Sequence, residues 1–144
     1  MEHASLRAWL LDLASTTRER GYWRAIRKDL PEDFHEFVTI EAALVAYRQF
    51  ETMLVPGLLQ TADHTRALIN GARPGLAPDV VERRVLARLA RQRVLTRATP
   101  LQYHVILEEV ILERPVGNSL VMHNQCGWSF AWRHRVRGAG LRPR

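Results

Sequence analysis

Residues 50–61 read Phe50-Glu51-Thr52-Met53-Leu54-Val55-Pro56-Gly57-Leu58-Leu59-Gln60-Thr61. Proline fixes φ and glycine permits positive φ, so Pro56-Gly57 predicts a sharp corner after an extended apolar arm. Thr61 then has the position of a helix N-cap, whose hydroxyl can accept a hydrogen bond from the amide of Asp63 or His64. We therefore expect an extended arm, a corner and a capped helix, in that order.

The helix after the corner is expected over residues 62–70. Asp63 lies in its first turn, where a negative charge suits the helix dipole. Gly71 follows Asn70 and predicts the stop. The apolar residues of this region are expected in the hydrophobic core, and they are Leu54, Val55, Leu58, Leu59, Leu68 and Ile69.

Length and composition indicate one ordinary globular domain. The chain has 144 residues, 47% of them hydrophobic and 25% charged. No run approaches the roughly 18 apolar residues of a membrane span, and Glu2 and Asp12 argue against a secretory signal. A single cysteine, Cys126, cannot form an internal disulfide, which agrees with a reducing compartment. We expect a cytoplasmic protein.

The net charge of +6 invites a nucleic-acid interpretation, but its distribution argues against one. Five arginines and no acid lie in residues 126–144, which leaves residues 1–125 with a charge of only +1. A basic tail could touch phosphates nonspecifically. The main body is not a basic platform for nucleic acid.

The spacing of apolar residues predicts a mainly helical chain with a small sheet. Helices are expected over residues 5–20, 34–46, 78–95 and from 119 onward, where Asn118 is a cap. Strands are expected over residues 47–54 and 101–107, and residues 108–114 suit a short helical turn or a strand exit. The helix from residue 34 reads as buried, with apolar positions Phe34, Phe37, Val38, Ile40, Ala42 and Leu44. The predicted class is α+β.

The helix expected over residues 78–95 carries an arginine-rich face. Arg84, Arg88 and Arg91 follow one another at spacings of four and three. One interpretation is a stripe that contacts phosphate or an acidic partner. We favour the other, a solvated face paired with acids, because charge runs on helices usually face water. A DNA-recognition helix would need a second small helix before it, which the pattern does not show.

Residues 126–144 do not continue the helix pattern that begins at residue 119. Trp128, Phe130 and Trp132 are followed by arginine, glycine, alanine and proline without periodicity. This composition is what GC-rich codons give when read out of frame. We therefore expect an irregular arginine-rich tail, frameshifted or divergent, after a partial domain at residues 1–125. Sequencing the gene tests this, because a frameshift requires a plausible continuation in another frame.

The sequence offers few residues for catalysis or metal binding. His123 and Cys126 have the spacing of two metal ligands, but two ligands without others at expected spacing are a weak signal. Glu108 and Glu109 are adjacent, so on a strand they would point to opposite faces and could not act together on one substrate. We expect a protein that is not an enzyme and that uses no metal and no cofactor.

Several short segments of the sequence together resemble those of a domain that follows an XRE-type helix-turn-helix in actinobacterial transcriptional regulators. That domain is regarded as antitoxin-like. The resemblance spans about residues 5–125. The matching words are Arg20-Gly21-Tyr22-Trp23, Leu30-Pro31-Glu32 with Phe34, Phe37-Val38, Ile40-Glu41-Ala42, Phe50-Glu51, Leu54 to Thr61, Arg88-Leu89-Ala90-Arg91-Gln92, Glu108-Glu109 through Leu112, Arg114-Pro115-Val116-Gly117, Val121-Met122 and Gln125.

The resemblance implies a non-catalytic regulatory domain that senses a signal or binds a partner. The family's helix-turn-helix would precede residue 1, and its later strands would follow residue 125, so we expect an incomplete domain that reaches DNA only through a missing module. The partners considered are a small protein encoded nearby and a second copy in a homodimer. The alternatives are a small basic nucleic-acid binder that acts through the arginine tail and a nonfunctional gene remnant.

Six polar residues within or beside the matching words are the candidate binding site. Each of them could also cap or pair structurally. They are Glu51, Gln60, Arg88, Arg91, Gln92 and Glu109.

Overall fold

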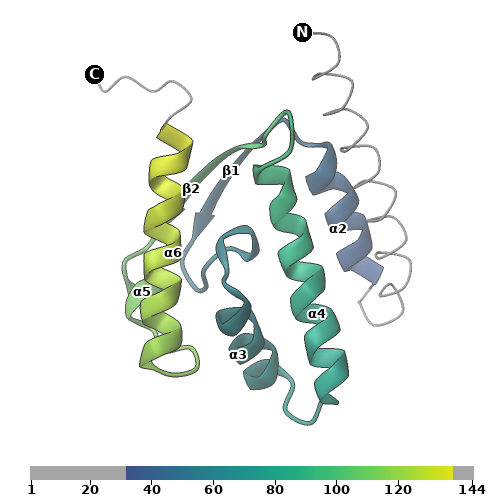
Figure 1. Cartoon of the computed structure of the whole chain (residues 1–144), viewed down its shortest axis with the longest axis vertical. Coiled ribbons are helices and arrows are strands. Elements are labelled where there is room, and N and C mark those ends of the chain that lie inside the picture. The colour runs from purple at the N-terminus through teal and green to yellow at the C-terminus, as the bar shows by residue number, and fades with distance from the viewer. Residues whose placement is uncertain (1–31, 138–144) are drawn as a thin grey trace, which may run out of the picture.

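The computed structural model describes residues 32–137 (Figure 1). The helix expected over residues 5–20 lies outside this range. Along the described chain the elements are α2 (Glu32–Ala43), β1 (Ala46–Glu51), η2 (Gly57–Leu59), α3 (Ala62–Ala72), α4 (Pro78–Arg91), η3 (Gln92–Leu95), β2 (Gln102–Leu107), α5 (Val110–Glu113) and α6 (Ser119–Arg137). Helices predominate and the sheet is small, so the fold is α+β, as predicted.

The two strands run parallel, although residues 52–101 separate them in the sequence. Ala46 pairs with Gln102 and Glu51 with Leu107. A parallel pair needs a long crossover connection, and here α3 and α4 provide it. Figure 1 shows the strands behind and between α6 and α4. The alternation in residues 101–107 is thus confirmed as a strand.

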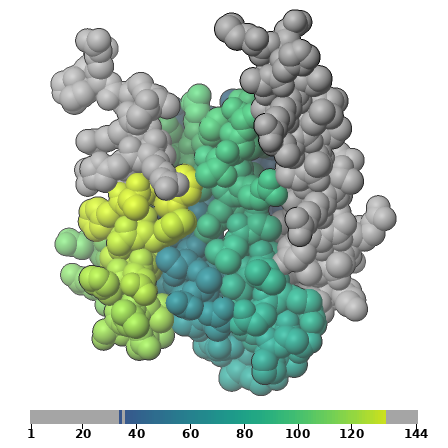
Figure 2. Space-filling model, in the orientation of Figure 1, coloured from purple at the N-terminus to yellow at the C-terminus, as the bar shows by residue number. Residues whose placement is uncertain are grey.

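The hydrophobic core lies between the sheet, α6 and the corner. Its buried cluster joins Leu58 of the corner, Leu95 of η3, Tyr103 of β2 and Trp132 of α6, with Leu101. Full burial of a side chain of this kind stabilises the fold by roughly 1.5–3 kcal/mol relative to exposure. The space-filling view shows α6, α3 and α4 side by side on the near face (Figure 2). The core thus joins the corner, η3, the sheet and the C-terminal part of α6.

Local capping signals are confirmed at two helix starts. The Thr61 hydroxyl accepts a hydrogen bond from the amide of His64 at 3.3 Å, and Asp63 lies in the first turn of α3. The Asn118 side chain accepts one from the amide of Val121 at 3.0 Å, at the start of α6. Each cap satisfies an amide that has no partner within its helix.

The predicted stop at Gly71 is wrong. Helix α3 continues through Gly71 to Ala72, and Arg73 leaves the helix with φ −140° and ψ 72°. Pro74 follows Arg73, and a residue before proline is pushed away from helical geometry. The proline therefore ends this helix, and the glycine is tolerated inside it.

Two expectations about burial are also wrong. Helix α2 is not a buried helix, because Phe37 and Ile40 on it are 41% and 56% exposed. Leu54 is 41% exposed, since β1 ends at Glu51 and residues 52–54 form a bend outside the core. Val55 and Leu58, which come next, are buried as predicted.

Helix α6 does not stop near Gln125, so the expectation of an irregular chain from Cys126 is wrong as far as Arg137. The helix runs without interruption from Ser119 to Arg137. Trp128 and Trp132, one helical turn apart, stack edge to face with ring centroids 5.9 Å apart. Trp132 is 9% exposed and belongs to the core cluster. Among residues 32–137, no helix has the length and apolar character needed to cross a membrane.

Replacing Trp132 with alanine tests whether this part of α6 is integral to the fold. We expect Trp132→Ala to lower the free energy of unfolding by about 3–5 kcal/mol, because it leaves a cavity among core residues. Urea denaturation followed by circular dichroism measures the loss. Phe130→Ala is the matched control, since Phe130 is on the same helix but 55% exposed. Equal, small effects of both substitutions would show that residues 126–137 are dispensable.

Candidate functional site

The corner at residues 55–61 is buried although most of its backbone belongs to neither a strand nor an α-helix. Pro56 precedes η2, which is one 3-10 turn long, and Gln60 follows it with extended geometry. Val55, Pro56, Leu58 and Gln60 are all buried. Buried carbonyls and amides must find hydrogen-bond partners, because leaving one unpaired costs about 1–3 kcal/mol. The structure supplies these partners from side chains.

Three glutamine side chains hold the corner's backbone. Gln60 Nε2 donates to the carbonyl of Val55, and Gln92 Nε2 donates to the carbonyl of Gln60, both at 2.6 Å. Gln125 Nε2 donates to the carbonyl of Leu59 at 2.6 Å, while its Oε1 accepts from the amide of Thr61 at 2.7 Å. These glutamines come from the corner itself, from η3 and from α6. The corner is therefore tied to two distant parts of the chain.

A buried ion pair lies against the same corner. Arg91 donates to both carboxylate oxygens of Glu41, from Nε at 2.8 Å and from Nη2 at 2.7 Å. Their side chains are 7% and 2% exposed, and the Arg91 guanidinium also lies 4.8 Å from the ring centroid of Phe37. A Cβ at Gly57 would come within 3.1 Å of Arg91 Nη1. Glycine at this position thus leaves room for the guanidinium beside the corner.

Arg88 and His64 form a partly buried basic pair next to Gln60. Arg88 Nη1 donates to Gln60 Oε1 at 3.1 Å, and the Thr65 hydroxyl donates to the same oxygen at 3.1 Å. Burial lowers the pKa of His64 below its ordinary 6.5, and the charge of Arg88 lowers it further. Burial, with the charge of Arg91, also lowers the pKa of Arg88. His64 Nδ1 has no hydrogen-bond partner. His64 therefore favours its neutral form.

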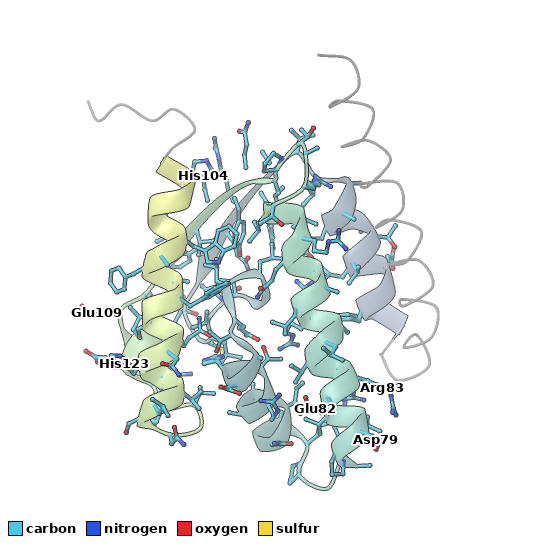
Figure 3. The ribbon with its side chains drawn as sticks, in the orientation of Figure 1. Asp79, Glu82, Arg83, His104, Glu109 and His123 are labelled. Carbon is cyan, nitrogen blue, oxygen red and sulfur yellow. The ribbon has the colours of Figure 1, made fainter. Side chains whose placement is uncertain are left out.

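The structure brings four of the six candidate residues together. Gln60 accepts from Arg88 and Gln92, and Arg91 lies beside them against Gly57. The other two, Glu51 and Glu109, lie away from this cluster. Glu51 accepts from Gln49 at the end of β1, and Glu109 is exposed before α5, on the outer side of the molecule (Figure 3).

The preferred interpretation of the arginine face of α4 is wrong about solvation for Arg91 and Arg88, although its pairing with acids holds for Arg91. Arg91 is buried against Glu41, and Arg88 is partly buried against Gln60. The expectation holds nearer the start of the helix, where Arg83 pairs with Asp79 at 2.7 Å and Glu82 pairs with Arg66 of α3. Figure 3 shows Asp79, Glu82 and Arg83 together at that end. The helix changes from solvated to buried along its length.

Sequence reasoning missed Glu41, His64 and Gln125 as members of the cluster. Glu41 and Gln125 lie inside words that carried the family resemblance, so polar residues in those words were the available signal. His64 gave no such signal, because its role depends on burial against Arg88 of another helix. Among residues 32–137, no three histidine, cysteine, aspartate or glutamate side chains gather as metal ligands. The chemistry of the cluster is bracing of backbone and pairing of buried charge.

The fold and the polar cluster define the class of this protein: it is an α+β domain whose buried Pro-Gly corner is held by side-chain hydrogen bonds. Residues 34–128 match the family described as Domain of unknown function (DUF5753). The chain belongs to this family. No curated protein and no solved structure matches it.

Breaking the buried ion pair should be strongly destabilising. We expect Glu41→Gln to lower the free energy of unfolding by about 3–5 kcal/mol, because it leaves the Arg91 charge buried without its partner. The double change Glu41→Leu with Arg91→Met should cost much less, since it removes both charges. Arg66→Ala, at the exposed pair with Glu82, is the control and should change stability far less. If urea denaturation gives the double variant a lower free energy of unfolding than Glu41→Gln, the expectation is contradicted.

The lowered pKa of His64 predicts acid sensitivity. As the pH falls through 6.5 the unfolded chain protonates this histidine before the folded chain does, so the contribution of His64 to stability is complete above pH 6.5 and falls as the pH decreases. Between about pH 7.5 and about pH 5.5, wild type should lose more stability than His64→Gln, as measured by urea denaturation. His123→Gln, at an exposed position of α6, should behave like wild type. Equal losses in wild type and His64→Gln would refute the assignment.

Proposed function

We propose that this chain is the non-catalytic regulatory domain of a helix-turn-helix transcriptional regulator and that it acts by binding a protein partner. DNA contact in the intact regulator comes from a separate module. The domain's surface for the partner is the open face of the β1–β2 sheet. The single observation that carries the proposal is the exposure of Phe50 and Ile106, which pair in register on that face and are 60% and 67% exposed.

The exposure is informative because parallel strands are normally covered on both faces. In this chain the opposite face of the sheet carries Tyr103 and Val105, which pack into the core. Adjacent large apolar side chains on an open face mark interaction sites, whereas scattered ones need no explanation. The resemblance of the sequence to regulator domains supports the regulatory role.

The polar cluster supports binding through the sheet instead of through the candidate site. Gln60, Gln92 and Gln125 direct their amides at the corner's backbone, and the Arg91 charge is paired with Glu41. Groups used in this way are not available to recognise a ligand without breaking the scaffold. Signal sensing at the cluster is therefore the weaker form of the proposal.

The arrangement of charge on α4 favours a protein partner over nucleic acid. Arg66 is paired with Glu82, Arg83 with Asp79 and Arg91 with Glu41. Nonspecific affinity for DNA comes from basic groups that neutralise phosphates, and acids paired with those groups oppose it. The proposal thus assigns no phosphate-binding stripe to this helix.

A two-hybrid assay against the small proteins encoded by adjacent genes tests the proposal. We expect one of them to bind wild type and Leu120→Lys but not Phe50→Lys. Leu120 is the control, because it is 66% exposed on α6, away from the sheet. Fluorescence anisotropy with a labelled DNA duplex is the second measurement. Tight recognition of one defined duplex by this chain alone, or partner binding that ignores Phe50→Lys, would overturn the proposal.

A further inference from the structure

The open face of the sheet has an ordered pattern of charge. Its residues are those at even positions, and all of them are exposed: Ala46, Arg48, Phe50, Gln102, His104 and Ile106. We call these residues the outer face. Alternate residues of a strand point to opposite sides, which places the outer face opposite the side that Tyr103 and Trp132 fill.

Along the strands, the outer face changes from basic to apolar to acidic. Arg48 and His104 are partners in register, and Phe50 and Ile106 are the next pair on this face. Glu108 has the same parity as His104 and Ile106, is exposed, and still donates its amide to the carbonyl of Glu51 at 3.0 Å. At a rise of about 3.3 Å per residue, His104 and Glu108 lie roughly 7 Å on either side of Ile106.

We propose that the outer face binds the outer face of a second copy of this chain. This inference rests on the proposed function, because it concerns the same face: where no other protein partner is bound, a second copy covers Phe50 and Ile106. An interface between identical copies must be self-complementary about a two-fold axis. The axis that suits this pattern lies in the interface, perpendicular to the strands, at the level of Phe50 and Ile106.

The symmetry places each charge against its opposite. Rotation about that axis reverses the strand direction, so His104 faces Glu108 of the partner subunit and Arg48 lies near the same carboxylate. Phe50 and Ile106 meet their own counterparts at the centre. An unrelated partner would need no such balance of basic and acidic ends. The opposite character of the two ends, basic at Arg48 and His104 and acidic at Glu108, is what favours a second copy.

The strength of the dimer follows from the size of the face. Two strands of six residues cover much less than the roughly 800 Å² per partner of a standard interface. We expect a dimer that dissociates in the micromolar range and exchanges rapidly.

Sedimentation equilibrium of the full chain over a range of concentrations measures the dissociation constant. Ile106→Lys should weaken the dimer at least about tenfold, because it buries a charge at the centre of the interface. Leu120→Lys, whose residue is almost as exposed but lies on α6, should leave it unchanged. Circular dichroism confirms that each variant is folded. A wild type that is monomeric at all concentrations, or an equal effect of both variants, would overturn the inference.

A charge exchange tests the arrangement of the copies. His104→Glu and Glu108→Lys should each weaken the dimer, since each places like charges together across the axis. The double variant should recover part of the lost affinity, because the carboxylate introduced at position 104 faces the ammonium introduced at position 108, while the charge of Arg48 near that ammonium keeps the recovery incomplete. Absence of recovery would exclude the proposed two-fold arrangement. If the chain is monomeric but Phe50→Lys still abolishes binding of an adjacent-gene product, this inference fails and the proposed function stands.

Discussion

The structure depends on satisfying the buried backbone of one corner. Val55, Leu59 and Gln60 present carbonyls in the core that have no ladder partner in a sheet. Amide side chains suit this task, because one group can donate and accept at once. Gln125 does both, bonding Leu59 and Thr61 together. Since Gln92 and Gln125 belong to η3 and α6, making the corner's hydrogen bonds also positions the elements that enclose the core.

The same corner explains why charge is buried nearby. The absence of a side chain at Gly57 leaves room for Arg91, and Glu41 of α2 neutralises the charge of Arg91. A buried pair of this kind does not add much stability over an apolar pair, but it strongly disfavours arrangements that separate its members. The ion pair therefore fixes how α2 lies on α4. The polar residues of the corner are thus occupied in holding the scaffold together.

Features encoded by neighbouring residues could be predicted from the sequence, and features that join distant residues could not. The alternation of residues 102–107 and the caps at Thr61 and Asn118 carry their own signals. The sequence motifs that resemble the family indicated Gln60, Arg88, Arg91 and Gln92 as candidate site residues. No local pattern shows that Arg91 pairs with Glu41. The sequence predicts too early a stop for α6, because arginine, glycine, alanine and proline without periodicity follow its aromatic residues, whereas burial of Trp132 against distant core residues continues the helix.

The long crossover between the strands has a consequence for the order of folding. Residues 52–101 must be closed into a loop before β1 meets β2. Loop-closure entropy grows slowly with length, and a loop of this size costs about 2 kcal/mol more than a four-residue hairpin. The helical hairpin of α3 and α4 shortens the effective loop, so its prior formation reduces that cost. Strand pairing is therefore a late event along the folding pathway, which follows assembly of the helices that the chain makes between the strands.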